Sequence, residues 1–83
     1  MIIALFDRNS GALQYIAKNA ATALDAVVEF DEVIRINPYD LPIEEIAEEY
    51  YAYKITEEAL RIADSGSDPY RIPEEFWDHA QKI

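Results

Sequence analysis

The sequence predicts a small α+β domain: a three-stranded antiparallel sheet in the order strand, strand, helix, strand, then a long acidic helix and a short C-terminal helix. Three observations predict it: two apolar runs separated by turn formers, an apolar pattern of helical period in the second half, and Gly and Pro residues that end this pattern. With 83 residues, of which 51% are hydrophobic, the chain can form one core and is too apolar for a disordered acidic tail. We therefore expect a single domain over residues 1–83.

The first two strands are expected to form a hairpin from residues 1–6 and 12–17. Residues 1–6 are apolar throughout, and the second run contains Leu13, Tyr15 and Ile16. The five residues between them, Asp-Arg-Asn-Ser-Gly, are mostly turn formers, and Gly11 can adopt a positive φ.

The middle of the chain is expected to supply a helix and the third strand. Apolar residues recur at helical spacing over residues 20–29, and Asn19 or Thr22 could cap a helix there. The adjacent β-branched residues Val27 and Val28 leave a strand as the alternative for this segment. Residues 33–36 are rich in β-branched side chains, and Pro38 would end a strand there. This ββαβ order completes the expected sheet.

The strongest helical pattern follows Pro42, which suits a first helical position. One apolar stripe occupies positions i, i+3, i+4 and i+7 from Ile43, and a second stripe, offset from the first, starts at Tyr51. Together they predict one helix over residues 43–63, which either wraps its contact face or kinks near residues 54–56. Residues 65–69, Ser-Gly-Ser-Asp-Pro, should stop it, with Gly66 as a left-handed cap. A last short helix should follow Pro73 and dock through its apolar side chains, which are Phe76, Trp77 and Ala80.

The charge balance is strongly acidic. Seven Lys and Arg stand against seventeen Asp and Glu, a formal net charge of −10. Residues 1–39 carry five acids and three bases, and the remainder carries twelve acids and four bases, so the acidity is concentrated in the later part. This balance disfavours direct binding to nucleic acid or an anionic membrane and favours a basic protein partner.

Glutamates form a row on the predicted long helix. Glu44 and Glu48, like Glu45 and Glu49, stand at i and i+4, where like charges destabilise a helix by about 0.2–0.5 kcal/mol per pair. The helix dipole favours the first two, but not the later ones or the further pair Glu57 and Glu58. One interpretation is a charged face that keeps a small domain soluble; the other is an anionic surface presented to a partner.

Three tyrosines follow this row, and they cannot all point into one core from a helix. We expect Tyr50 to be buried and at least one of the three to be exposed. Tyr51 or Tyr53 would then be either a surface residue or an anchor for a partner, since tyrosine is favoured at interface hot spots.

Catalytic and metal-binding chemistry is not expected. The chain has no Cys and one His, His79, the serines lie in expected turns, and the two glycines are isolated. Asp64, Asp68 and Glu75 match three positions of a calcium loop, but Pro69 stands where that loop needs glycine, so a turn at Asp68 is the better interpretation. We therefore expect no enzyme, no cofactor and no metal.

The leading functional hypothesis is a small cytoplasmic inhibitor that binds a basic, nucleic-acid-handling protein by mimicking nucleic acid charge. Phage or mobile-element anti-defence proteins, of the anti-CRISPR or anti-restriction type, use this strategy. Cytoplasmic placement is expected because the apolar run 1–6 is far shorter than a signal-peptide core or membrane span. The alternatives are an antitoxin or nuclease immunity protein, and a structural homodimer or subunit contact whose acidity serves only solubility. The expected partner-binding residues are Glu44, Glu45, Glu48, Glu49, Tyr51, Tyr53, Glu57 and Glu58.

Overall fold

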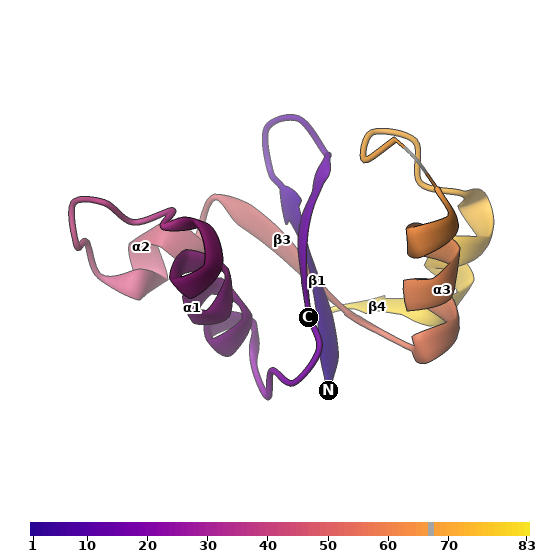
Figure 1. Cartoon of the computed structure of the whole chain (residues 1–83), viewed down its shortest axis with the longest axis horizontal. Helices are drawn as coiled ribbons and strands as arrows, with labels where there is room; N and C mark the ends of the chain where they lie inside the picture. Colours follow the sequence, from indigo (N-terminus) through magenta and orange to yellow (C-terminus); the bar gives the residue numbers. More distant parts are fainter. Residues whose placement is uncertain (67) are drawn as a thin grey trace.

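A computed structural model, which describes residues 1–66 and 68–83, shows a four-stranded antiparallel sheet with helices on both faces (Figure 1). The strand order is β2-β1-β3-β4. Helices α1 and α2 cover one face and α3 and η1 the other, so the prediction of a mixed α+β fold is confirmed. The elements in chain order are β1 (Ile2–Asp7), β2 (Leu13–Ala17), α1 (Ala23–Ile34), α2 (Ile43–Ala47), β3 (Tyr50–Ile55), α3 (Glu57–Ser65), the 3-10 helix η1 (Glu74–His79) and β4 (Ala80–Lys82).

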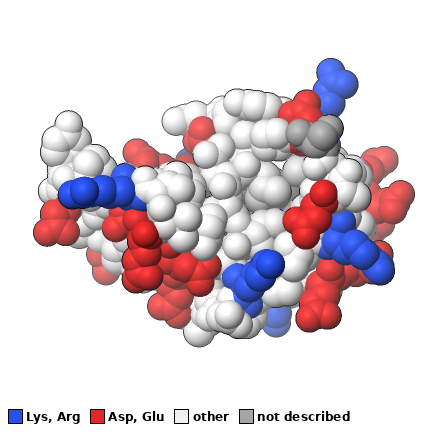
Figure 2. Space-filling model, in the orientation of Figure 1, with Lys and Arg blue, Asp and Glu red and all other residues white. Residues whose placement is uncertain are grey.

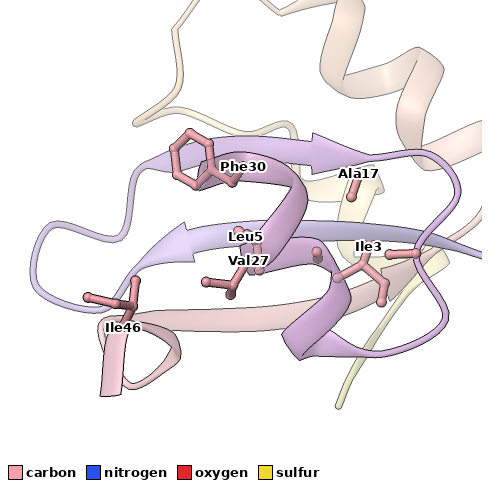
Figure 3. Packing of buried hydrophobic residues seen from close by; sticks show 8 residues of the cluster. Ile3, Leu5, Ala17, Val27, Phe30 and Ile46 are labelled. Carbon is pink, nitrogen blue, oxygen red and sulfur yellow. The ribbon is translucent and has the colours of Figure 1, made fainter. Parts of the chain in front are cut away.

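Strand β1 lies at the centre of the sheet and is buried on both faces. Ile3 and Leu5 belong to the core cluster beneath α1, whereas Ala4 and Phe6 belong to the cluster beneath α3. Figure 3 shows the first cluster, where Val27 of α1 lies over the sheet near Leu5. A strand covered on both sides needs no polar alternation, which explains why residues 1–6 are apolar throughout.

The predicted hairpin of β1 and β2 is confirmed. Gly11 has a φ of 76°, and the Asp7 carboxylate accepts hydrogen bonds from the Asn9 amide (3.1 Å) and the Ser10 hydroxyl (2.9 Å). The register runs from Ile3 opposite Ala17 to Phe6 opposite Leu13, with an irregularity between Leu5 and Phe6. Short-range turn chemistry is therefore enough to define this part of the fold.

The helix expected over residues 20–29 is α1, and it is longer than predicted. Thr22 caps it, because its hydroxyl accepts a hydrogen bond from the Asp25 amide (3.1 Å). The prediction of a strand over residues 33–36 is wrong: α1 continues to Ile34 and ends at Arg35, whose φ is 58°. Once the helix is nucleated upstream, the β-branched Val33 and Ile34 extend it at little cost, and no turn residue intervenes.

The prediction of one long acidic helix over residues 43–63 is also wrong. The segment forms the short helix α2, the strand β3 and the helix α3. Strand β3 pairs with β1 over six positions, from Ile2 opposite Ile55 to Asp7 opposite Tyr50. Its aromatic side chains alternate between the two faces of the sheet. The two offset stripes belong to different elements, since the first begins in α2 and the second begins in β3. The new helix begins at Glu57, and its N-cap, Thr56, lies within the segment where a kink was expected.

The C-terminal region adds a fourth strand that was not predicted. The short helix after Pro73 is confirmed as η1, with Phe76 fully buried, Ala80 packed in the same core cluster and Trp77 exposed. The next three residues, β4, pair with β3 through Ile55 and Ala80. Gly66 follows α3 with a φ of −86°, so the prediction of a left-handed cap is wrong. Ser67, within the predicted stop, lies outside the described residues.

Candidate protein-binding surface

The charges are divided among the layers of the fold. The segment that contains α1 and α2, residues 23–49, carries nine acids and one base, and the segment from α3 through η1, residues 57–79, carries seven acids and two bases. The remainder, mostly strands, carries one acid and four bases. Figure 2 shows acidic side chains gathered toward both helical ends of the molecule. The most strongly anionic part is therefore the α1–α2 layer, with a net charge of −8.

The four glutamates around α2 are displayed at this layer's surface. Glu44 and Glu45 lie in the first turn of α2, Glu48 is its C-cap, and Glu49 precedes β3. All four are exposed, and none of them forms an ion pair among the described residues. Their carboxylates are therefore free to meet cationic groups of another molecule.

A groove of about 680 Å³ lies between α2 and the turn that joins β1 to β2. The amide of Arg8 donates a hydrogen bond to the carbonyl of Glu49 (2.9 Å), which holds this turn beside α2. The lining residues combine three carboxylates and two apolar side chains with one guanidinium and one amide, and are Arg8, Asn9, Leu41, Glu45, Ile46, Glu48 and Glu49. Such a surface suits a Lys or Arg side chain, whose aliphatic stem packs on apolar groups while its charged head meets carboxylates.

Glu57 and Glu58 lie on the other side of the sheet from α2. They occupy the first turn of α3, and Glu58 forms an ion pair with Arg61. A helix dipole favours acids at this position, so the expectation that no helix end accounts for them is wrong. The structure therefore does not join this pair to the α2 glutamates in one continuous row.

The three tyrosines of β3 are all half-buried, so the expectation that at least one is exposed is wrong. Tyr50 packs in the core cluster beneath α1, with its ring 5.8 Å from that of Phe30. Burial, followed by the charges of Glu49 and Asp7, raises the pKa of Tyr50 above its ordinary value. The alternation of β3 distributes the tyrosines over two covered faces.

Tyr51 and Tyr53 lie on the α3 face of the sheet. The ring of Tyr53 is 5.5 Å from Phe6 and 5.1 Å from Trp77. The ring of Tyr51 is contacted by two cations, with Arg8 Cζ and Lys82 Nζ each 4.7 Å from its centroid. The sheet thus separates both tyrosines from the α2 glutamates, and Arg8 connects the two sides because it contacts the ring of Tyr51 and also lines the groove.

A smaller cavity of about 250 Å³ lies at the end of the β3–β4 pair, where Lys54, Asp78 and His79 contribute to its lining. The backbone amide of Thr56 donates to the carbonyl of His79 (3.1 Å), which ties η1 to the start of α3.

Within residues 1–66 and 68–83, no group of three Asp, Glu or His side chains could hold a metal ion. Nor is any helix of these residues long and apolar enough to cross a membrane.

The predicted turn at Asp68 is confirmed. Asp68 Oδ1 accepts a hydrogen bond from the Tyr70 amide (2.9 Å), and its carbonyl accepts one from the Arg71 amide (3.1 Å). The side chain and the backbone of Asp68 therefore both close this turn.

Sequence reasoning identified the α2 glutamates but missed the other residues of the groove. Arg8 and Asn9 come from a turn distant in the sequence, which the pairing of β1 with β3 brings next to α2, whereas Leu41 lies two residues before α2. Comparison with protein-family models, with curated proteins and with solved structures finds no significant match.

Proposed function

We propose that this chain is a small acidic inhibitor that acts in the cytoplasm by binding a basic, nucleic-acid-handling protein and occupying its nucleic acid site. The anti-CRISPR or anti-restriction type of anti-defence protein, from a phage or mobile element, is the class favoured. The observation that carries the proposal is the α1–α2 layer, with nine acids against one base and four exposed glutamates around α2 that form no ion pair within residues 1–66 and 68–83.

The physical basis is competition with phosphates. A protein that holds nucleic acid presents Lys and Arg side chains spaced to neutralise a phosphate backbone. Carboxylates accept the same charge-assisted hydrogen bonds, and a net charge of −8 on one layer draws such a surface toward it. Glu44, Glu45, Glu48 and Glu49 are proposed as the main contacts. Tyr51 and Tyr53 lie on the other face, so they would take part only where a partner extends past Arg8.

The test is capture of the partner and loss of capture on charge removal. The tagged chain is incubated with lysate and washed in steps of rising salt, and the bound proteins are identified by mass spectrometry. The Glu44→Gln, Glu45→Gln, Glu48→Gln, Glu49→Gln variant should lose the partner while keeping its circular dichroism spectrum. A matched control removes four exposed charges from the other helical layer, with Asp64→Asn, Glu74→Gln, Glu75→Gln and Asp78→Asn. Equal retention by both variants contradicts the proposal.

A second measurement separates charge mimicry from binding elsewhere on the partner. The purified partner is loaded with its nucleic acid, and the chain is added. Mimicry requires mutual exclusion, with the displaced nucleic acid released in proportion to the chain bound. A ternary complex in gel filtration would show that the chain does not occupy the nucleic acid site. The identity of the partner distinguishes an anti-defence protein from an antitoxin or nuclease immunity protein, because the latter two capture a toxin or a nuclease made by their own host.

A further inference from the structure

The buried stripe of α1 continues past the part of the helix that the sheet covers. Val27 and Phe30 are buried, and Ile34, which follows them at i+7 and i+4, lies on the same face but is 57% exposed. Val33 of α1, and Tyr39 and Leu41 of the segment that joins α1 to α2, are also exposed. This segment forms one end of the molecule (Figure 1). We call Val33, Ile34, Tyr39 and Leu41 the apolar tip.

The apolar tip is held in place by hydrogen bonds and is not a loose loop. The Asn37 amide donates to Asp31 Oδ1 (2.8 Å), which folds the chain back onto the end of α1. The Asn37 side chain then pairs with both backbone groups of Leu41, at 2.8 and 2.9 Å. Asp40 adopts a left-handed φ of 55°, which completes the turn. Leu41 is thereby fixed where it also lines the acidic groove.

The charge around the apolar tip decides what can cover it. The layer that bears it has nine acids and one base, so nucleic acid and anionic membranes are repelled. A second copy would bring the same charge of −8 against itself. A basic segment with an apolar stripe is complementary in both respects, and protein interfaces commonly combine an apolar centre with a charged rim.

We propose that the apolar tip and the adjoining groove dock a basic amphipathic helix of the partner. Its apolar side chains pack on Ile34 and Leu41, and its Lys or Arg side chains meet Glu45, Glu48 and Glu49. This inference rests on the proposed function, since it names the partner element that the α1–α2 layer recognises. It adds a requirement that charge mimicry alone does not make: the partner must offer apolar side chains beside its cations.

The test uses two labelled helical peptides of equal positive charge, one with lysines and a stripe of leucines, the other with glutamines in place of the leucines. By fluorescence anisotropy, the leucine peptide should bind about tenfold more tightly, the factor expected from burying roughly one leucine side chain. The Ile34→Ser, Leu41→Ser variant should abolish this difference. The Leu24→Ser, Val28→Ser variant, at positions 37% and 40% exposed elsewhere on α1, should preserve it.

The outcomes separate this inference from the proposed function. Equal, salt-sensitive binding of both peptides overturns the inference and leaves charge recognition intact. If neither peptide binds, the result contradicts both the inference and the proposed function. Preference for the leucine peptide that survives Ile34→Ser, Leu41→Ser places the apolar contact elsewhere and overturns the inference. So does a dimer in light scattering that this variant dissociates, because a second copy would then cover the tip. Circular dichroism of each variant verifies that it is folded, and the comparison of the two peptides on the unaltered chain needs no variant.

Discussion

Tyr15 connects the hairpin to α1 through a hydrogen bond that depends on pH. Its hydroxyl donates to Glu29 Oε2 (2.7 Å), and its ring is stacked on Phe30 with centroids 4.9 Å apart. This hydrogen bond first, and then burial and the charges of Glu29 and Glu32, raise the pKa of Tyr15 from 10.0 to about 12. The protonated hydroxyl is therefore favoured more in the folded chain than in the unfolded one.

Stability in alkali should therefore depend on Tyr15. Because the folded pKa lies above the unfolded one, the contribution of Tyr15 is fully present below pH 10 and is lost as the pH rises toward 12. Tyr15→Phe should cost roughly 0.5–1.5 kcal/mol of unfolding free energy at neutral pH and should flatten the decline above pH 10. Urea unfolding at a series of pH values measures both effects. An unchanged alkaline slope in Tyr15→Phe would assign the decline to other groups, of which Tyr50, with its raised pKa, is the first to examine.

Thr56 gives a residue-level test of where α3 begins. Its hydroxyl accepts a hydrogen bond from the Ala59 amide (3.2 Å), as an N-cap does. Thr56→Ala should destabilise the fold by about 1 kcal/mol, and Thr56→Ser should largely retain stability. If residues 43–63 formed one continuous helix, Thr56 would be internal and alanine would stabilise it instead. The sign of the change in thermal unfolding therefore distinguishes the two arrangements.

At the scale of elements, the sequence predicted correctly those elements that are defined by residues close together in the chain. The hairpin could be predicted because Asp7, Ser10 and Gly11 define its turn within five residues. Strand β3 could not, because Tyr50 fits helical spacing from Ile43 and Tyr51 begins a second stripe of helical period, and only pairing with β1 decides between strand and helix. Strand β4 is three residues long and has no pattern of its own. The candidate site divides in the same way: α2 glutamates were visible in the sequence, and the groove, which needs Arg8 beside Glu49, was not.

Because β1 is buried on both faces, substitutions at two adjacent residues of this strand should each lower the unfolding free energy through a different core. Leu5 faces α1 and Phe6 faces α3, and both are almost completely buried. Leu5→Val and Phe6→Leu should each lower the unfolding free energy by about 1 kcal/mol, since each removes packed volume from a different core. Their effects should be nearly additive, because the two side chains belong to opposite faces of the sheet. A negligible cost for either substitution, measured by urea unfolding, would contradict a strand that is covered on both sides.

For the molecule as a whole, the acidity of the α1–α2 layer should cost stability. Glu44, Glu45, Glu48 and Glu49 form no ion pairs among the described residues and stand among nine acids with a single base nearby in the sequence. The variant that changes all four to Gln should unfold at a higher temperature than the unaltered chain at low salt, and the difference should shrink as salt screens the repulsion. Calorimetry across a salt series measures this, and a lower unfolding temperature for the variant would make these glutamates structural.

Solubility and recognition can be separated because two variants share one net charge. Each of two variants removes four negative charges and leaves a formal charge of −6. The α2 variant changes Glu44, Glu45, Glu48 and Glu49 to Gln, and the control carries Asp64→Asn, Glu74→Gln, Glu75→Gln and Asp78→Asn. If the acidity served only solubility, both should precipitate at the same salt concentration and bind a basic peptide equally well, since colloidal repulsion depends on the total charge. Recognition by the α1–α2 layer requires equal solubility but unequal binding, with the loss confined to the α2 variant. Equal binding by both would return the four glutamates to the simpler role of a solvated surface.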